Sequence, residues 1–406
     1  MIKEFIKYKV VIKVRQNLKD KLKIILPKFV INLIQWYRSK KMPLLKNVLD
    51  SNYLRNALLV YITEPFITGI NDKHQNSWQV IEIAKAISKF GYNIDVCDYN
   101  YNKKDFNKKY DLLIDLHPRD NAVYNKFLKS NCIKIAYLTG SNISFASAAE
   151  QKRIDEVYRR RNAKLIPRRQ APLISKRIES YNAAFFIGNK YNLRTFSEFK
   201  MPPVYFIKNT GYDFNFCNEK RKANNFMFLG SAGQVHKGLD LLLEVFAEKC
   251  KNCNLYVCSS FENESDFCKA YKYELYNTSN IHPIGFVDIK SDKFKEIAEK
   301  CAYMIMPSCS EANAGSVLTA MSAGVIPIVS RECGFEDDEV IHLKDCSKEC
   351  IDDSIKFYAS KDEEWIKSES EKAVKIVKER YSEECFVESV IKALSNILNT
   401  KEHLYV

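Results

Sequence analysis

Short apolar runs recur along the chain, each four to eight residues long and bounded by polar residues, Gly or Pro. Runs of this length are typical of buried parallel strands, and several of the amphipathic segments between them have helical spacing. Alternating strands and helices indicate an α/β protein. The predicted strands are Ala57–Thr63, Asn93–Val96, Asp111–Leu116, Ile133–Leu138, Ala183–Ile187, Phe226–Leu229, Asn254–Ser259, Asn280–Val287, Tyr303–Met306 and Val325–Val329.

The segments between these strands predict helices and loops. Glu64–Ser77 contains Pro65 and Gly69, so it is predicted to be a long loop. A helix follows it and ends before Gly91. The predicted helices are residues 78–90, 153–162, 239–249, Val317–Ala323 and Glu383–Leu398.

One acid stands out between the last two predicted strands. Glu311 lies in the loop after Met306, and Gly315-Ser316 then opens a helix. The free N–H groups at a helix start suit an anion, and glycine allows a close approach of the backbone. An anionic ligand is therefore expected beside Glu311.

A second glycine-bearing turn follows the strand Phe226–Leu229. The sequence GSAGQVHKG leads into a predicted helix, which is an arrangement that can hold a phosphate. It has the spacing of neither a Walker loop nor a dinucleotide fingerprint. Lys237 lies immediately before that helix and supplies a cation.

The stretch around Glu311 resembles the C-terminal motif of retaining, family-four-type glycosyltransferases of the GT-B fold. Six residues match that motif in register, but Thr319 stands where the family has a second Glu. The resemblance implies that Glu311 contacts the donor sugar and that Thr319 faces the ribose hydroxyls. The matching residues are Glu311, Leu318, Ala320, Met321, Gly324 and Pro327.

The glycine turn resembles the same family. Lys237-Gly238 is retained, whereas Ser231 replaces an Arg that holds the donor diphosphate together with the Lys. The resemblance further implies that the backbone near Gly285 reads the base, which leaves a UDP-sugar or a GDP-sugar open. The predicted donor-binding residues are Ser231, Gly233, His236, Lys237, Gly285, Phe286, Ala314, Gly315, Ser316 and Thr319.

The first half of the chain has its own candidates, because ligands gather at the carboxyl ends of strands in open α/β sheets. His117 follows the strand Asp111–Leu116, and the resemblance gives it a place near the reacting centre; the alternative is that it caps the loop before Pro118. Gly69, His74 and Asn142 are the predicted acceptor-binding residues.

The N-terminal segment is strongly basic. Residues 1–47 contain thirteen Lys or Arg and two acids, a net +11, which leaves only +2 of the total +13 for the remaining residues. Apolar residues recur there at near-helical spacing, which predicts an amphipathic arm on an anionic membrane surface. Packing on the enzyme body and binding to nucleic acid are the alternatives. No uncharged run is long enough to span a bilayer, and the cations recur too often for a secretory signal.

The cysteines favour no metal site. Thirteen are scattered through the chain without a repeating frame, which is typical of a reducing cytosol. Cys250 and Cys253 alone have metal-like spacing, and neither a second such pair nor a His pair accompanies them. Arg168-Arg169, in a second basic cluster, are candidates for a phosphate-bearing acceptor, although a solvated face is the commoner role for such charge.

The sequence as a whole predicts a GT-B protein with two Rossmann-like domains facing a cleft. The predicted function is metal-independent sugar transfer from a nucleotide sugar to a glycan or lipid-linked acceptor, at the cytoplasmic face of a membrane and without nucleic acid. A nucleotide-sugar epimerase and a non-catalytic nucleotide-sugar binder remain the alternatives. The predicted divisions are residues 1–47 (arm), 48–205 (acceptor domain), 206–382 (donor domain) and 383–406 (helix and tail).

Overall fold

The structure is a computed structural model that describes residues 43–70, 75–120, 122–169, 174–214, 216 and 221–402. Most of the predicted arm and His74 lie outside the described residues. The described residues up to Leu116, with Asp120–Ile135, form one compact unit, and His117–Arg119 with the residues from Ala136 onward form another. The predicted domain boundary between residues 205 and 206 remains a prediction.

The first sheet has six strands in the order β2-β1-β3-β4-β5-β6. β1 pairs in parallel with both β2 and β3, and β5 pairs in parallel with β6. Each predicted strand of this half is present, whereas β6 follows Pro202-Pro203 and was not predicted. The strands are β1 (Arg55–Tyr61), β2 (Tyr92–Asp98), β3 (Tyr110–Leu116), β4 (Leu128–Leu138), β5 (Ala183–Ile187) and β6 (Val204–Ile207).

The helices of this half differ from the prediction at two places. The predicted loop from Glu64 contains a short helix, α3 (Glu64–Thr68), because Pro65 fits the first turn of a helix and an acid is favourable at its N-terminus. α5 (Ile143–Arg161) begins ten residues before the predicted start, because Asn142 caps it by accepting a hydrogen bond from the Ser144 N–H at 2.9 Å. The remaining helices are α4 (Asn76–Lys89) and α6 (Lys190–Leu193).

The last residues of the predicted arm contact the first sheet. Leu45 forms an antiparallel bridge with Val96 of β2, and the Asn47 N–H donates to Asp95 at 2.9 Å. Leu45 and Asn47 therefore both contact β2, and the predicted end of the arm at residue 47 remains a prediction.

The second sheet also has six strands, in the order β12-β11-β10-β7-β8-β9. The predicted strand Asn280–Val287 is wrong in length: β9 stops at Pro283, which has no N–H to continue the ladder. The Ile284 and Gly285 N–H groups instead turn to the Val257 carbonyl. The strands are β7 (Lys222–Gly230), β8 (Asn254–Ser259), β9 (Ile281–Pro283), β10 (Cys301–Met306), β11 (Ile326–Val329) and β12 (Ile341–His342).

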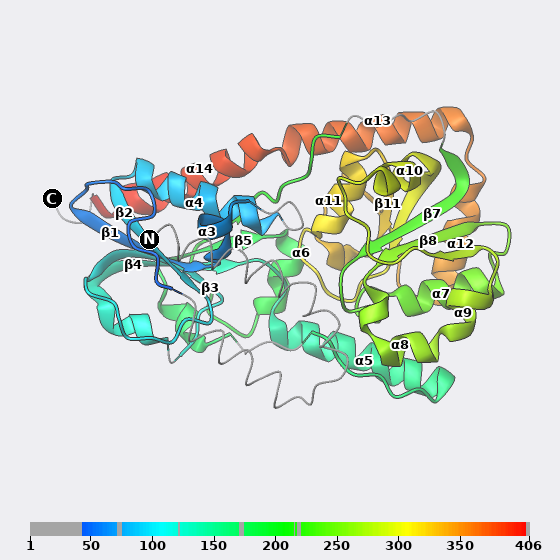
Figure 1. Cartoon of the computed structure of the whole chain (residues 1–406), viewed down its shortest axis with the longest axis horizontal. Helices are drawn as coiled ribbons and strands as arrows, with labels where there is room; N and C mark the ends of the chain where they lie inside the picture. The colour runs from blue at the N-terminus through cyan, green and yellow to red at the C-terminus, as the bar shows by residue number, and fades with distance from the viewer. Residues whose placement is uncertain are drawn as a thin grey trace, which may run out of the picture. The chain divides into compact units, whose positions relative to one another are not determined.

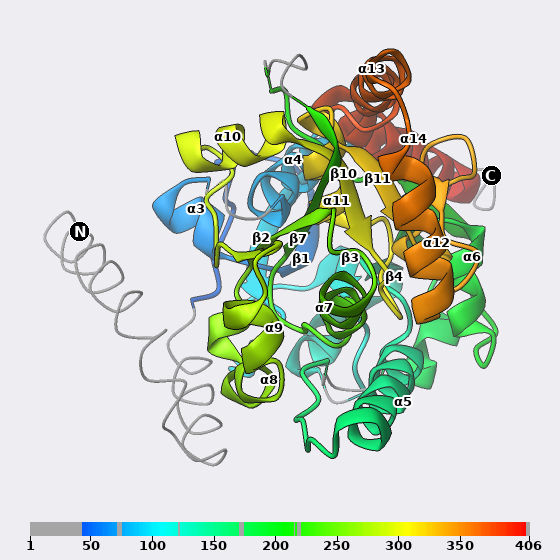
Figure 2. The same ribbon diagram turned by 90° about the vertical axis from the view of Figure 1, so that its right-hand side faces the viewer.

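Helices cover both faces of the second sheet (Figure 1). α10, α11 and α13 lie on one face and α7 and α9 on the other, as the end-on view of Figure 2 also shows. α12 packs beside α7. The helices are α7 (Leu239–Glu248), α8 (Ser265–Ala270), α9 (Lys272–Asn277), α10 (Asp292–Lys300), α11 (Gly315–Ser322), α12 (Lys348–Ala359) and α13 (Glu363–Arg380).

The core of this second layer lies along β7 and β10. All six residues of β10 are buried, and Phe226 of β7 stacks on Tyr303 with ring centroids 5.1 Å apart. Burial of a side chain of this size contributes about 1.5–3 kcal/mol, so the two strands form a firm support for the loops that follow them.

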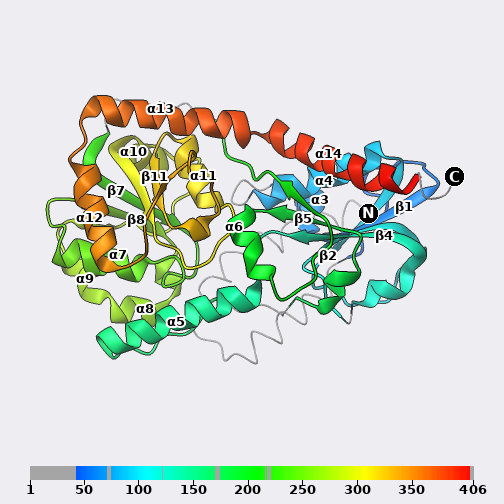
Figure 3. The ribbon, with the colours of Figure 1, turned by 180° about the vertical axis from the view of Figure 1, so that it is seen from behind.

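The last two helices run in succession along the chain (Figure 3). α13 packs on α11, and α14 (Glu383–Glu402) packs beside β6, so the predicted C-terminal helix is confirmed. Among the described residues, none of the helices combines the length and the apolar character that crossing a bilayer requires.

Candidate active site around Glu311

Two loops form the candidate site, and each follows a buried strand of the second sheet. β10 leads through residues 307–314 into α11, and β7 leads through residues 231–238 into α7. Because β7 and β10 are paired neighbours, their carboxyl ends bring these loops together. The loops are also bonded directly: the Cys309 N–H and the Ser308 hydroxyl both donate to the His236 carbonyl, at 2.9 and 3.2 Å.

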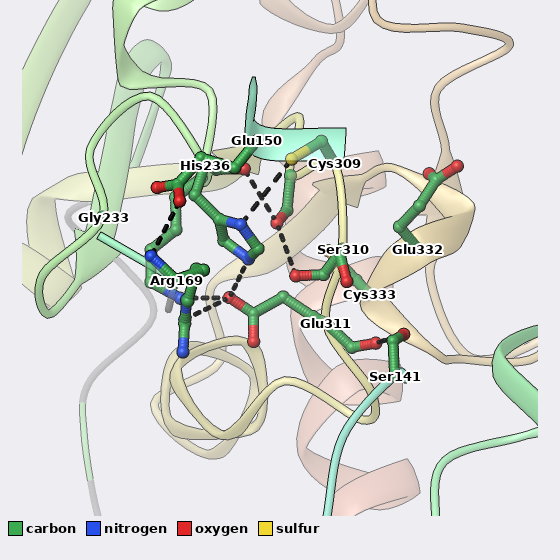
Figure 4. A network of polar contacts seen from close by, with 12 residues as sticks. Ser141, Glu150, Arg169, Gly233, His236, Cys309, Ser310, Glu311, Glu332 and Cys333 are labelled. Carbon is green, nitrogen blue, oxygen red and sulfur yellow. Dashed lines mark hydrogen bonds and ion pairs between the residues drawn. The ribbon is translucent and has the colours of Figure 1, made fainter. Parts of the chain in front are cut away.

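The Glu311 carboxylate lies among three basic side chains (Figure 4). Its Oε1 is paired with the Lys237 ammonium and accepts a hydrogen bond from Arg169 Nη2 at 3.2 Å. His236 Nε2 lies 3.7 Å from the same oxygen. Lys237 is only 5% exposed, so its charge depends on this carboxylate for compensation.

The charges in the site follow from burial and from these contacts. Burial alone raises the pKa of Glu311, but Lys237 and then Arg169 lower it to a net value of about 2. Burial lowers the pKa of His236 to about 3, and Arg169 acts in the same direction. At neutral pH the site therefore holds an ionised carboxylate beside two cations and an uncharged imidazole.

The backbone of Glu311 is fixed as firmly as its side chain. Its carbonyl accepts hydrogen bonds from the Ser141 hydroxyl at 2.5 Å and from the Asn192 amide at 3.1 Å. Its N–H donates to the Glu332 carbonyl at 3.2 Å. A carboxylate held in this way keeps its position before a ligand arrives, which favours binding and orientation of that ligand.

The glycine turn after β7 has an internal carboxylate partner. Gly233 adopts a positive φ of 87°, and its N–H donates to Glu264 at 2.6 Å, while the Gln234 N–H donates to the same carboxylate at 3.3 Å. A phosphate reaches these two N–H groups only if Glu264 releases them. Burial raises the pKa of Glu264, against the lowering effect of the two backbone hydrogen bonds.

Residues 213–398 match the family model for "Glycosyl transferases group 1". The chain carries a group 1 glycosyltransferase domain. Both loops around Glu311 lie inside this domain, whereas Arg169 lies outside it. Among curated proteins, none matches the sequence.

Several solved structures share the fold. A sucrose-phosphate synthase from Thermosynechococcus elongatus has a TM-score of 0.59 at 10% identity, covering 85% of this chain and 100% of that chain. A glycosyltransferase from Rickettsia africae has a TM-score of 0.55 at 12% identity, covering 85% and 99%. The Anabaena protein HepE has a TM-score of 0.51 at 10% identity, with the same coverage. At these identities the likeness shows the fold, which is GT-B.

The length of the chain differs from that of some similar structures. It spans about half of TarM, with 54% and 55% of that chain covered in two structures. The activity, substrates and partners of the whole protein are therefore proposals.

The start of α11 in the group 1 domain contains four of the predicted donor residues. Ala314 is the residue before the helix, and Gly315 and Ser316 form its first turn. The Thr319 hydroxyl donates to the Gly315 carbonyl at 2.9 Å and is 5% exposed. Its oxygen keeps acceptor capacity, so a ribose contact by Thr319 remains a prediction.

The predicted base-reading loop lies beyond β9. Gly285 adopts a φ of 82°, and Phe286 beside it has 59% of its surface exposed. A Cβ added to Gly285 would lie 3.6 Å from the Glu262 carboxylate. This loop thus places an exposed aromatic ring next to a glycine of positive φ and near the Glu262 carboxylate. Its role toward a base remains a prediction.

His117 lies where it was predicted, at the end of β3. Its ring Nε2 is 3.4 Å from the Thr139 hydroxyl, and its backbone has a φ of 53°, a conformation that is uncommon for residues other than Gly. Burial lowers its pKa to about 4, with a contribution from Arg119. His117 is therefore uncharged at neutral pH, and a role at the reacting centre remains a prediction.

Asn142 and Gly69, two of the predicted acceptor residues, have structural roles. Besides capping α5, the Asn142 amide donates to Glu198 at 2.7 Å, and Asn142 is 1% exposed. Gly69 ends α3 with a φ of 89°. Contact of either residue with an acceptor stays a prediction, as does that of His74 outside the described residues.

Three residues of the site have little or no signal in the sequence. Arg169 was singled out only as a candidate for an acceptor phosphate, Glu264 was not singled out, and Asn192 had no signal at all. Arg169 lies 142 residues before Glu311, so no local pattern could have paired them. Ser231 stands where the family motif has an Arg, and this replacement is the one sequence signal that another part of the chain supplies a cation to the site.

Among the residues that the structure describes, no three His, Cys, Asp or Glu side chains are grouped so as to hold a metal ion. The Cys250 thiol donates to Asp352 at 3.1 Å, and burial raises its pKa to about 12. Whether Cys250 and Cys253 hold a metal is not decided by this contact, and the metal-independence of the protein remains a prediction.

Proposed function

We propose that the protein transfers a sugar from a nucleotide sugar to a glycan, lipid-linked or other acceptor, in the biosynthesis of surface polysaccharides or glycoconjugates. The observation that carries this proposal is the contact between Lys237 and Glu311 inside the group 1 domain. A nucleotide sugar places a diphosphate and sugar hydroxyls on the two sides of one glycosidic bond. A fixed cation can bind the diphosphate, and the fixed carboxylate next to it can accept hydrogen bonds from the sugar hydroxyls.

In the proposed reaction, the bond between the anomeric carbon and the diphosphate breaks, and the diphosphate leaves with the electron pair. A bond forms between that carbon and an acceptor hydroxyl oxygen, whose proton passes to the leaving phosphate. Lys237, Ser231 and the backbone around Gly315 stabilise the growing negative charge without a metal. Glu311 orients the sugar, and His117 lies near the reacting centre. Retention of configuration follows from the family resemblance.

The proposed donor is a UDP-sugar or a GDP-sugar. The Anabaena HepE structure is a complex with UDP and glucose, which makes UDP-glucose a reasonable first donor to test here. Gly285 and Phe286 are the proposed contacts of the base. Because a backbone loop reads a base through few side chains, the choice between uracil and guanine is left to experiment.

We propose that residues 48–205 form the domain that binds the acceptor and that residues 206–382 form the domain that binds the donor. We also propose that the basic N-terminal segment holds the protein on the cytoplasmic face of an anionic membrane, as suits a lipid-linked acceptor. The charge of that segment supports this, since it carries +11 of the total +13.

Labelled nucleotide sugars test the proposal against its competitors. Transfer to an acceptor, or slow release of free sugar, supports the transferase. An isomerised donor would instead identify an epimerase. Binding without any turnover would identify a non-catalytic module, a candidate that Ser231 and Thr319 favour because both replace charged residues of the family motif.

A further inference from the structure

The donor site has lost one cation at a defined position. Ser231 stands at the turn after β7, where the family motif has an Arg, and it is exposed. A hydroxyl cannot replace the charge or the two parallel N–H groups of a guanidinium. Lys237 is then the only cation that this turn itself contributes to a diphosphate.

Arg169 brings a guanidinium to the same turn from another part of the chain. Its Nε would lie 3.7 Å from a Cβ built on Gly233, two residues after Ser231. Its Nη2 donates to Glu311 at 3.2 Å, and the same Glu311 oxygen is paired with Lys237. Arg169 and Lys237 therefore converge on one Glu311 oxygen, beside the turn that lacks its own Arg.

Two buried nitrogens of this cluster have no hydrogen-bond partner among the described residues. One is Arg169 Nε, and the other is Nε2 of His236, a side chain that is 1% exposed. A buried donor without an acceptor is costly, and such groups are rare outside functional sites. Their convergence beside Glu311 points to a ligand that brings acceptor oxygens.

The segment that carries Arg169 is anchored on both sides of its backbone. The N–H groups of Arg168 and Arg169 donate to Glu150 at 3.0 and 2.7 Å, and the Ser147 hydroxyl donates to the Arg169 carbonyl at 2.9 Å. The Arg168 side chain pairs with Asp266, and its Nε lies 3.7 Å from the Glu264 carboxylate. The guanidinium of Arg169 is thus presented from a fixed backbone, which reduces the entropy that binding would cost.

We propose that Arg169 is the second cation of the donor-diphosphate site and substitutes for the Arg that Ser231 replaces. This rests on the proposed function. Arg169 and Lys237 hold the diphosphate oxygens between them, and His236 donates to one of these oxygens when its proton is on Nε2. Glu311 is paired with these two cations in the structure, and once the diphosphate binds them its carboxylate is free to contact the sugar.

The test measures the affinity of the full chain for UDP, GDP and pyrophosphate, with uridine and guanosine as ligands that lack the diphosphate. Arg169→Ala should weaken binding of the diphosphates roughly 10- to 100-fold, the scale of hydrogen bonds to a charged group, and leave nucleoside binding unchanged. Arg169→Lys should retain part of the affinity. Arg159→Ala is the matched control, because Arg159 is an exposed Arg near the end of α5, ten residues before Arg169.

A double variant tests the substitution itself. Ser231→Arg in the Arg169→Ala background should restore most of the lost diphosphate affinity, because it returns the guanidinium to the position that the family motif uses. If the Arg169→Ala and Arg159→Ala variants bind the diphosphates with equal affinity, the proposal is overturned. It is also overturned if adding Ser231→Arg to Arg169→Ala does not restore the lost diphosphate affinity. A wild-type chain that binds none of the diphosphates would instead overturn the proposed function, and this proposal with it.

Discussion

The Lys237 ammonium is paired with the Glu311 carboxylate, although 74 residues separate them in the sequence. One residue ends the glycine turn after β7 and the other lies in the loop after β10. The contact therefore joins the proposed phosphate-binding and sugar-binding halves of the site. It also means that each charge is compensated by the other before a donor arrives.

Lys237→Ala should weaken the binding of a nucleoside diphosphate by roughly 1.5–3 kcal/mol, the scale of a hydrogen bond to a charged group. Titration calorimetry with UDP and GDP measures this. Lys344→Ala is the control, because Lys344 is exposed on the same sheet layer, just after β12. Unchanged diphosphate affinity in Lys237→Ala would count against the assignment of Lys237.

The lowered pKa of Glu311 predicts a dependence of stability on pH. The pKa of Glu311 is about 2 in the folded chain, below the ordinary value of 4.5, so its stabilising effect is present above pH 4.5 and lost as the pH falls toward 2. The excess stability of the wild type over Glu311→Gln should therefore shrink by about 2–3 kcal/mol across this window. Denaturant unfolding of both proteins measures it. A difference that is constant with pH would contradict the ion-pair account.

Gly238→Ala should destabilise the chain by about 2–4 kcal/mol, the scale of a clash added to backbone strain. Gly238 has a φ of 81°, and a Cβ there would lie 2.5 Å from the Pro307 carbonyl oxygen. Gly140→Ala is the matched control, since a Cβ on Gly140 would have no atom within 4 Å. Thermal unfolding of the two variants compares them, and equal melting temperatures would show that the two loops are not packed as described.

Deleting residues 1–42 should abolish sedimentation with anionic vesicles and leave the enzyme body folded. The cut is placed before Leu45, because Leu45 bridges to Val96. Binding of the full chain should weaken as salt rises, since each Lys or Arg near an anionic surface contributes about 1 kcal/mol that salt screens. Identical pelleting of both proteins would rule out the membrane role. An insoluble truncated protein would favour packing of the segment on the enzyme body.

Local pattern predicted most of the fold. β5 and β8 have the predicted bounds, because each is an apolar run with polar or turn residues on both sides. α3 was missed because its five residues are too few to show a helical period. In the second sheet, Pro283 cut short a strand that the apolar pattern alone had extended to Val287.

The site was predicted only where its residues lie within one motif. Lys237 and Glu311 each follow a strand and precede a helix, so their neighbourhood could be inferred from the topology of parallel strands. Arg169 and Glu264 reach the site from irregular segments far along the chain, and such contacts depend on the packed structure. They leave no periodic trace in the sequence.

The effect of Glu311→Gln on turnover tests the central claim most directly. Gln keeps the shape of the side chain but removes the charge that we propose orients the donor sugar. Transfer or hydrolysis of labelled UDP- and GDP-sugars should fall by far more than the affinity for the bare nucleoside diphosphate, because we propose that Lys237 and Arg169 bind the diphosphate. Equal losses of turnover and diphosphate affinity would contradict the account, as would unchanged turnover.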